Sequence, residues 1–190
     1  MAKILPSEVE KRIKACIFEK ADNFGYASRT RSDNSAFMDE LVEDPEIGGV
    51  LREYYPGERV RTYIKDAVLN AYTKKKNNQI LKAQNLDSIL SHMYNEYIET
   101  IQKVNADTTL LKSHNGNLYV VGKGTILKWE TALRRALDTI ANCPNLILDG
   151  KYPKICLVLA VINGDITEAD KRHIISALDA IGVQVYFCGQ

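Results

Sequence analysis

The sequence predicts an α/β protein, in which a helical N-terminal lobe is followed by a small mixed β-sheet flanked by helices. Three observations lead to this prediction. Apolar residues recur at helical spacing through much of the first 105 residues. Two short apolar runs on either side of residue 115 are joined by His-Asn-Gly-Asn, which contains a strong hairpin signal. Residues 154–162, KICLVLAVI, form a continuous apolar run, typical of a strand buried on both faces of a sheet.

The composition is that of an ordinary globular protein. A length of 190 residues suits one domain, or a helical lobe (1–84) fused to an α/β core (85–190). The net charge of +1 indicates neither a nucleic-acid nor a membrane partner, so only local patches could do so. Four cysteines without a CxxC pair argue against a zinc site. No signal peptide or membrane-spanning run is apparent, so we expect a cytoplasmic protein.

Helical periodicity predicts the elements of the N-terminal lobe. The first helix is expected from an N-cap at Ser7 to about Lys20, with Glu10 completing a capping box. A flexible polar loop is expected over 24–34, and two short helices separated by a turn over 35–55. A further helix covers 58–72 and ends in a lysine-rich turn.

The C-terminal core is predicted to begin with a long helix over 85–105. Strands follow at 108–111 and 117–121, joined by the Asn115-Gly116 turn. Apolar spacing predicts a helix that ends before Cys143-Pro144. After the buried strand comes a helix with Thr167 as N-cap and Asp170 at its third position, and then a last strand at 183–188. Strand, helix and strand would make a crossover unit.

The basic residues of the helical lobe have two interpretations. They could lie along a nucleic-acid backbone, or they could complement a helix C-terminus and keep exposed segments soluble. The loop arginines could likewise bind phosphate or simply be solvated. If the protein binds nucleic acid, these are the candidate contacts: Arg29, Arg31, Arg59, Arg61, Lys74, Lys75 and Lys76.

Three charged residues surround the predicted hairpin. Asp107 opens its first strand, Lys123 closes its second, and Glu130 lies on the first turns of the following helix. Two acids and a lysine in this arrangement could hold a metal ion beside a phosphate.

The order of these elements, with Asp107 and Lys123 at these positions, resembles the restriction-endonuclease-like, PD-(D/E)xK, nuclease superfamily. The resemblance implies that Asp107 binds metal, that Lys123 is the catalytic lysine, and that Glu96 on the preceding helix is an accessory acid. The chain departs from the motif at Val121, where an acid is expected two positions before the lysine. Because some members carry this acid on the following helix, Glu130 could fill the role.

The resemblance implies Mg²⁺-dependent hydrolysis of phosphodiesters in double-stranded DNA, with Asp107, Lys123 and Glu130 as catalytic residues. Asp107, Glu130 and Glu96 would hold the Mg²⁺, which activates a water molecule, and a homodimer is a further expectation. The alternative is a catalytically inactive, nuclease-like subunit for binding or assembly, because Val121 replaces the acid. A third hypothesis is an unrelated interaction module, in which Asp107 caps a turn and Glu130 pairs with Arg134.

Overall fold

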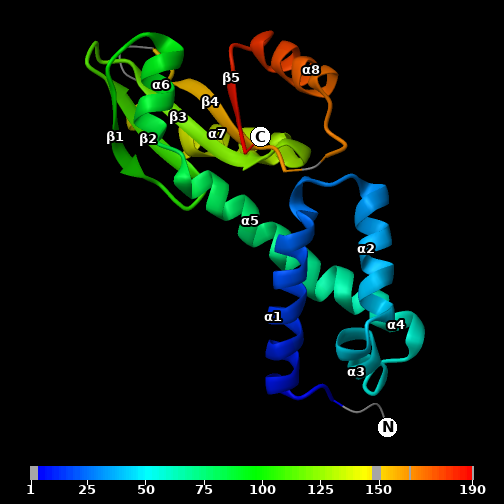
Figure 1. Ribbon diagram of the computed structural model, residues 1–190. Helices are drawn as coiled ribbons and strands as arrows, with labels where there is room; N and C mark the ends of the chain where they lie inside the picture. The colour runs from blue at the N-terminus through cyan, green and yellow to red at the C-terminus, as the bar shows by residue number, and fades with distance from the viewer. Residues whose placement is uncertain (1–3, 147–150, 163, 190) are drawn as a thin grey trace. The chain divides into compact units, whose positions relative to one another are not determined.

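Helices make up the first half of the chain and a five-stranded mixed sheet lies in the second, which confirms the predicted fold class (Figure 1). The computed structural model describes residues 4–146, 151–162 and 164–189. The chain divides into two compact units. The helical unit comprises Met1–Lys76 with Ile162–Asp165, and the α/β unit comprises Asn77–Val161 with Ile166–Gln190.

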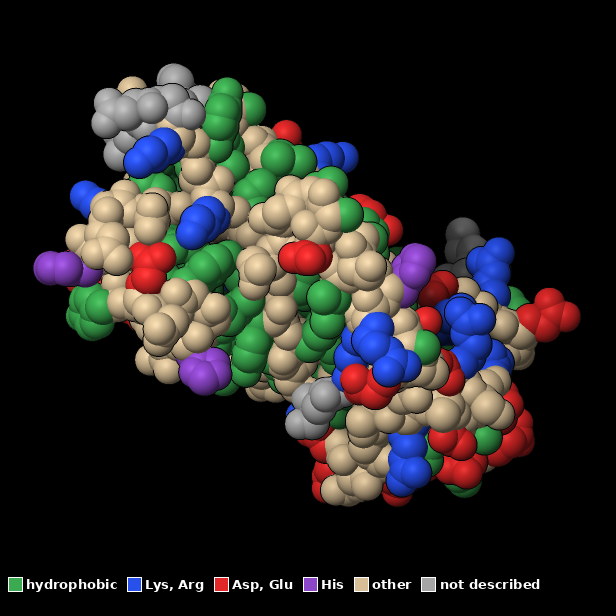
Figure 2. All heavy atoms as spheres, turned by 90° about the horizontal axis from the view of Figure 1, so that it is seen from above, with side chains coloured by type: hydrophobic (Ala, Val, Ile, Leu, Met, Phe, Trp, Pro, Cys, Tyr) green, Lys and Arg blue, Asp and Glu red, His purple; other side chains and the backbone are tan. Residues whose placement is uncertain are grey.

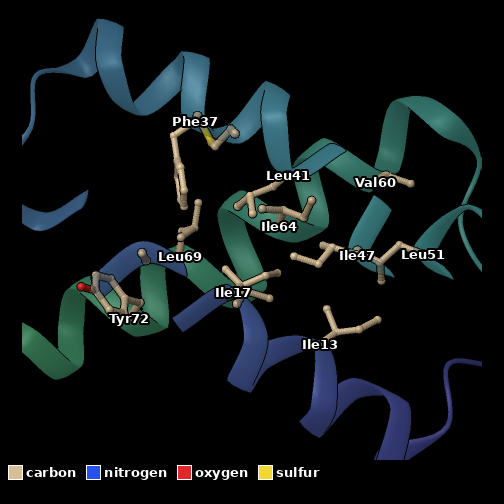
Figure 3. Close-up of a cluster of buried hydrophobic side chains, with 13 residues drawn as sticks. Ile13, Ile17, Phe37, Leu41, Ile47, Leu51, Val60, Ile64, Leu69 and Tyr72 are labelled. Carbon is tan, nitrogen blue, oxygen red and sulfur yellow. The ribbon is translucent and has the colours of Figure 1, made fainter. Parts of the chain in front are cut away.

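The helical unit is built on one apolar core. The side chains of Ile17, Ile47, Leu51 and Ile64 are fully buried, and they converge from different helices in Figure 3. Two π-helices, Pro45–Gly49 and Ile64–Leu69, contribute to this core. The other helices are α1 (Ser7–Phe24), a 3₁₀ turn (Tyr26–Ser28), α2 (Arg31–Glu43), α3 (Val50–Arg52), α4 (Gly57–Tyr63) and the first half of α5 (Asn70–Ala83).

The ends of these helices differ from the sequence predictions. Ser7 is already helical, so Pro6 is the N-cap of α1, and its side chain has no polar atom that could cap the helix. The helix continues past Lys20 to Gly25, whose φ of 73° ends it in the left-handed region. The predicted loop over 24–34 contains the start of α2, where Thr30 accepts a hydrogen bond from the backbone N–H of Asp33.

The sequence predicted that the helix ends at the lysine-rich stretch. In the structure α5 continues past it to Ala83. Its last turns carry Ile80 and Leu81, which pack in the core of the α/β unit, and this burial extends the helix past residues of low helix propensity. The lysines at 74–76 therefore lie within a helix.

The α/β unit contains one sheet with the strand order β1-β2-β3-β4-β5. The first three strands are antiparallel, and β3, β4 and β5 are parallel. Helices α7 and α8 connect the parallel strands, as the predicted crossover requires. The bounds are α6 (Leu86–Tyr94), β1 (Ile98–Lys103), β2 (Thr108–Ser113), β3 (Leu118–Thr125), a 3₁₀ turn (Ile126–Lys128), α7 (Trp129–Asn142), a second 3₁₀ turn (Pro144–Leu146), β4 (Lys154–Ala160), α8 (Glu168–Asp179) and β5 (Gln184–Cys188).

Each face of the sheet is covered by helices. On one face α6 and the end of α5 pack over residues that include Leu111, Tyr119 and Val121. On the other face α7 and α8 pack over residues that include Leu110 and Val120. Strand β4 is buried on both faces, as its continuous apolar run predicts.

Strand β1 was wrongly predicted as the second half of a helix. Helix α6 ends at Tyr94, because Asn95 adopts the left-handed conformation (φ 52°) that terminates helices. The chain then pairs with β2, with a bulge between Thr100 and Gln102. Glu96 consequently lies in the turn between α6 and β1 and not on a helix.

Strand β3 is longer than predicted and includes Gly122, Lys123 and Gly124. It pairs with β4 as far as Thr125, so Lys123 lies within the strand. Gly122 is required by packing, because a Cβ there would lie 2.7 Å from the carbonyl oxygen of Ala132 in α7. The predicted hairpin is present, although only Gly116 of its turn has a positive φ. The predicted N-cap at Thr167 is also confirmed, and Thr167 and Asp170 form a capping box.

Within the described residues no helix is both long and apolar enough to cross a membrane.

Candidate functional site

The ladder of β2 and β3 brings Asp107 and Lys123 together. Thr108 lies opposite Gly122. Asp107 precedes Thr108 and Lys123 follows Gly122, so Asp107 and Lys123 are neighbours at the same end of the sheet. The backbone N–H of Lys123 donates to the carbonyl oxygen of Asp107 at 2.7 Å, and the N–H of Asp107 donates to Asn105 Oδ1 at 2.9 Å. The backbone positions of these two residues are therefore fixed by strand pairing.

The carboxylate of Asp107 is paired with Arg135 of α7. The guanidinium donates to Asp107 Oδ2 and forms an ion pair with it, and both side chains are partly exposed. This partner was not predicted. Arg134 and Arg135 stand side by side in the sequence, and spacing alone does not indicate which one faces the strand.

Lys123 is a half-buried cation beside a second lysine. Thr109 lies opposite both Lys103 of β1 and Val121 of β3, so these three side chains lie on one face of the sheet. Lys123 shares this face by strand alternation. Burial first, and then the charge of Lys103, lowers the pKa of Lys123, while Asp107 offsets part of this shift. In the residues described, neither lysine side chain has a hydrogen bond or ion pair.

The position of the missing acid lies in the hydrophobic core. Val121 is fully buried, in a cluster that also contains Leu90 and Tyr119. A carboxylate at this position would have to be desolvated among apolar side chains.

Glu130 does not replace that acid in the structure. It lies on the first turn of α7, as predicted, but α7 covers the sheet face opposite to that of Lys123. Its side chain is exposed, and among the described residues it has no hydrogen bond or ion pair, including the predicted one with Arg134.

Glu96 lies at the other end of the hairpin from Asp107. Its carboxylate accepts hydrogen bonds from Tyr119 Oη at 3.1 Å and from Asn117 Nδ2 at 3.2 Å. Hydrogen bonding from Ser113, and then from Asn117 and Tyr119, lowers the pKa of Glu96. These contacts tie the α6–β1 turn to the hairpin.

The residues present do not fit the magnesium site that the resemblance implies. The Asp107 carboxylate is paired with a guanidinium, Glu130 belongs to the helix on the opposite face, and Glu96 lies at the far end of β2. Over the part of the chain that the structure describes, no group of three or more His, Cys, Asp or Glu residues could hold a metal ion.

Several candidate cations of the helical unit make contacts within that unit. Arg61 donates to Asp39 Oδ1 at 2.7 Å and to Ser35 Oγ at 2.8 Å. Lys76 pairs with Asp22 at 2.6 Å and lies over the ring of Tyr72.

Aromatic rings hold two further candidates. The Arg29 guanidinium lies 5.3 Å from the ring centroid of Phe24 and donates to the carbonyl oxygen of that residue. Lys75 lies 5.5 Å from the ring centroid of Phe18. The side chains of the remaining candidates have no hydrogen bond or ion pair within the described residues: Arg31, Arg59 and Lys74. On the face seen in Figure 2, basic and acidic side chains are interspersed and do not form one basic surface.

A shallow hollow of about 290 Å³ adjoins the Asp107–Arg135 pair. Its polar side chains come from both sides of the hollow, the β1–β2 connection and the second half of α7. The lining residues are Val104, Asn105, Arg135, Asp138, Thr139, Asn142 and Cys143. The candidate site is thus the end of the sheet that carries Lys103, Asp107 and Lys123. Arg135 reaches Asp107 from α7, the helix on the opposite face.

The chain matches no protein-family model, no curated protein and no solved structure.

Proposed function

We propose that the α/β unit binds the phosphate backbone of double-stranded DNA at this end of the sheet and does not cleave it. The observation that carries the proposal is the half-buried Lys123 beside Lys103, with neither ammonium group paired among the described residues. Holding two like charges together while removing one from water is unfavourable. A bound phosphate oxygen would relieve both costs.

The charge balance on the face that carries Lys103 and Lys123 supports an anionic ligand. The two lysines contribute two positive charges on one face of the sheet, and the charge of Asp107 is balanced by Arg135. Backbone phosphates are the anions that lysine and arginine contact most often in protein–DNA interfaces. Affinity gained in this way depends strongly on salt, because each phosphate contact releases condensed counterions.

Two features favour binding over hydrolysis. Metal-assisted hydrolysis requires carboxylates that converge on one ion and an activated water. Here the fully buried Val121 occupies the position of one expected carboxylate. The other carboxylate, that of Asp107, is paired with Arg135. Of hydrolysis and the non-catalytic alternative, the geometry supports the non-catalytic one.

The proposal is tested by titrating a fluorescein-labelled DNA duplex with the wild-type protein, Lys123→Gln and Lys103→Gln over a range of salt concentrations. Each substitution should weaken binding and reduce the slope of log K against log[salt] by about one. Lys112→Gln is the matched control, because Lys112 is an exposed lysine at the hairpin end of β2. Absence of binding at low salt, or equal losses in the control, would refute the proposal.

A further inference from the structure

Arg135 is presented to Asp107 from a rigid element. Its neighbours in α7, Ala132 and Ala136, are buried against the sheet. The close approach of Ala132 to Gly122 leaves no room for even a Cβ, so the helix packs directly against the strand at this point. The guanidinium therefore faces the amino end of β2 from a closely packed helix.

We infer that Arg135 is a built-in cation, which supplies beside Asp107 the positive charge that a divalent metal ion would supply in a nuclease-like site. The inference deepens the proposed function and rests on it for the identity of the bound anion. It states that the phosphate is bound without a metal ion, with Arg135 as the cation beside Asp107.

The chemistry of a metal ion and of a guanidinium explains why Arg135 can take the place of the metal. Mg²⁺ and Mn²⁺ require several oxygen ligands in a defined geometry, and the predicted ligands Asp107, Glu130 and Glu96 do not converge on one point. A guanidinium needs no such ligand set. It is always charged, and its planar fork of five N–H donors can contact a carboxylate and a phosphate together.

An isolated ion pair on a protein surface contributes little to stability, so the free energy of unfolding cannot distinguish a ligand-binding role from a structural one. Metal dependence and DNA affinity can. Thermal unfolding of the wild-type protein and Asp107→Asn is followed as Mn²⁺ is added. A metal site at Asp107 would raise the melting temperature of the wild type alone, by mass action.

We expect Mn²⁺ to change the melting temperatures of the wild type and Asp107→Asn by equal and small amounts. A saturable rise in the melting temperature of the wild type that Asp107→Asn abolishes would overturn the inference. This measurement uses no DNA, so its outcome is separate from the success or failure of the proposed DNA binding.

The second measurement is duplex binding in EDTA and in Mg²⁺. Wild-type affinity should be no lower in EDTA, and Arg135→Gln should weaken binding severalfold, with Arg135→Lys recovering part of the loss because it restores the charge but not the fork. Arg134→Gln is the matched control, since Arg134 is an exposed neighbour on the same helix. Unchanged affinity of Arg135→Gln, or loss of wild-type binding in EDTA, would contradict the inference.

Discussion

The helical unit and the end of the β-sheet differ in how many of their candidate cations have partners. In the helical unit, Arg61 and Lys76 form ion pairs with Asp39 and Asp22, and further cations lie over aromatic rings. At the end of the sheet, Lys103 and Lys123 lie on one face without such partners among the described residues. We therefore expect these two lysines, and not the paired cations of the helical unit, to bind an anion.

The largest effect is expected from restoring the missing acid. Val121→Glu should destabilise the α/β unit by about 3 kcal/mol or more, because the carboxylate would be buried without a partner. Urea unfolding followed by the fluorescence of Trp129, the only tryptophan, measures this loss. Leu127→Glu, at an exposed position of the same unit, should change stability by less than about 0.5 kcal/mol. Equal stability of both variants would show that the site tolerates the acid.

A smaller effect is expected at Gly122. Gly122→Ala should cost about 1–3 kcal/mol, because its Cβ would contact the Ala132 carbonyl oxygen at 2.7 Å and Leu157 Cδ2 at 3.1 Å. Gly57→Ala is the control in the helical unit, where an added Cβ meets nothing within 4 Å. Urea unfolding followed by far-UV circular dichroism compares the two. A loss at Gly57 as large as that at Gly122 would contradict the packing account.

The two groups of cations can be compared directly in DNA binding. Lys103→Gln with Lys123→Gln should weaken duplex binding by about tenfold or more and flatten the salt dependence by about two units of slope. Lys75→Gln with Lys76→Gln removes the same charge from the helical unit and should leave affinity nearly unchanged. Fluorescence anisotropy at several salt concentrations measures both. Equal losses would mean that the contacts made by the helical cations do not prevent them from binding DNA.

The smallest effect concerns the Asp22–Lys76 pair. The hydrogen bond from Lys76, and then that from Tyr72, lowers the pKa of Asp22 below its usual value of 3.8. The pair therefore stabilises the fold above that pH, and its contribution is lost as the pH falls through the lowered pKa. Lys76→Gln should cost about 0.5 kcal/mol or less near neutral pH and move acid unfolding to higher pH. An acid midpoint equal to that of the wild type would contradict this role.

Sequence reasoning predicted the elements whose signals are local. The buried strand β4, the N-cap at Thr167 and the hairpin turn at Gly116 are all present in the structure. Strand β1 was missed because apolar residues in an exposed edge strand, such as Ile98 and Ile101, can also match helical spacing. The local signal against a helix was Asn95, a residue that tolerates the left-handed conformation.

The site was predicted only in part, because some of its contacts have no local signal in the sequence. Strand pairing in a hairpin follows from the sequence, so the proximity of Asp107 and Lys123 could be predicted. The contact of Arg135 and the separation of Glu130 from Lys123 depend on where α7 lies over the sheet. That position is set by close packing of Gly122 against Ala132, which no local pattern reveals.

The most direct test incubates the purified protein with supercoiled plasmid in Mg²⁺, Mn²⁺ or EDTA and examines each sample for both retarded and nicked DNA. The account predicts retardation in all three conditions, without nicking, and weaker retardation with Lys123→Gln. Metal-dependent nicking that is lost in Asp107→Ala would contradict it, because a metal ion would then be acting at the carboxylate that pairs with Arg135.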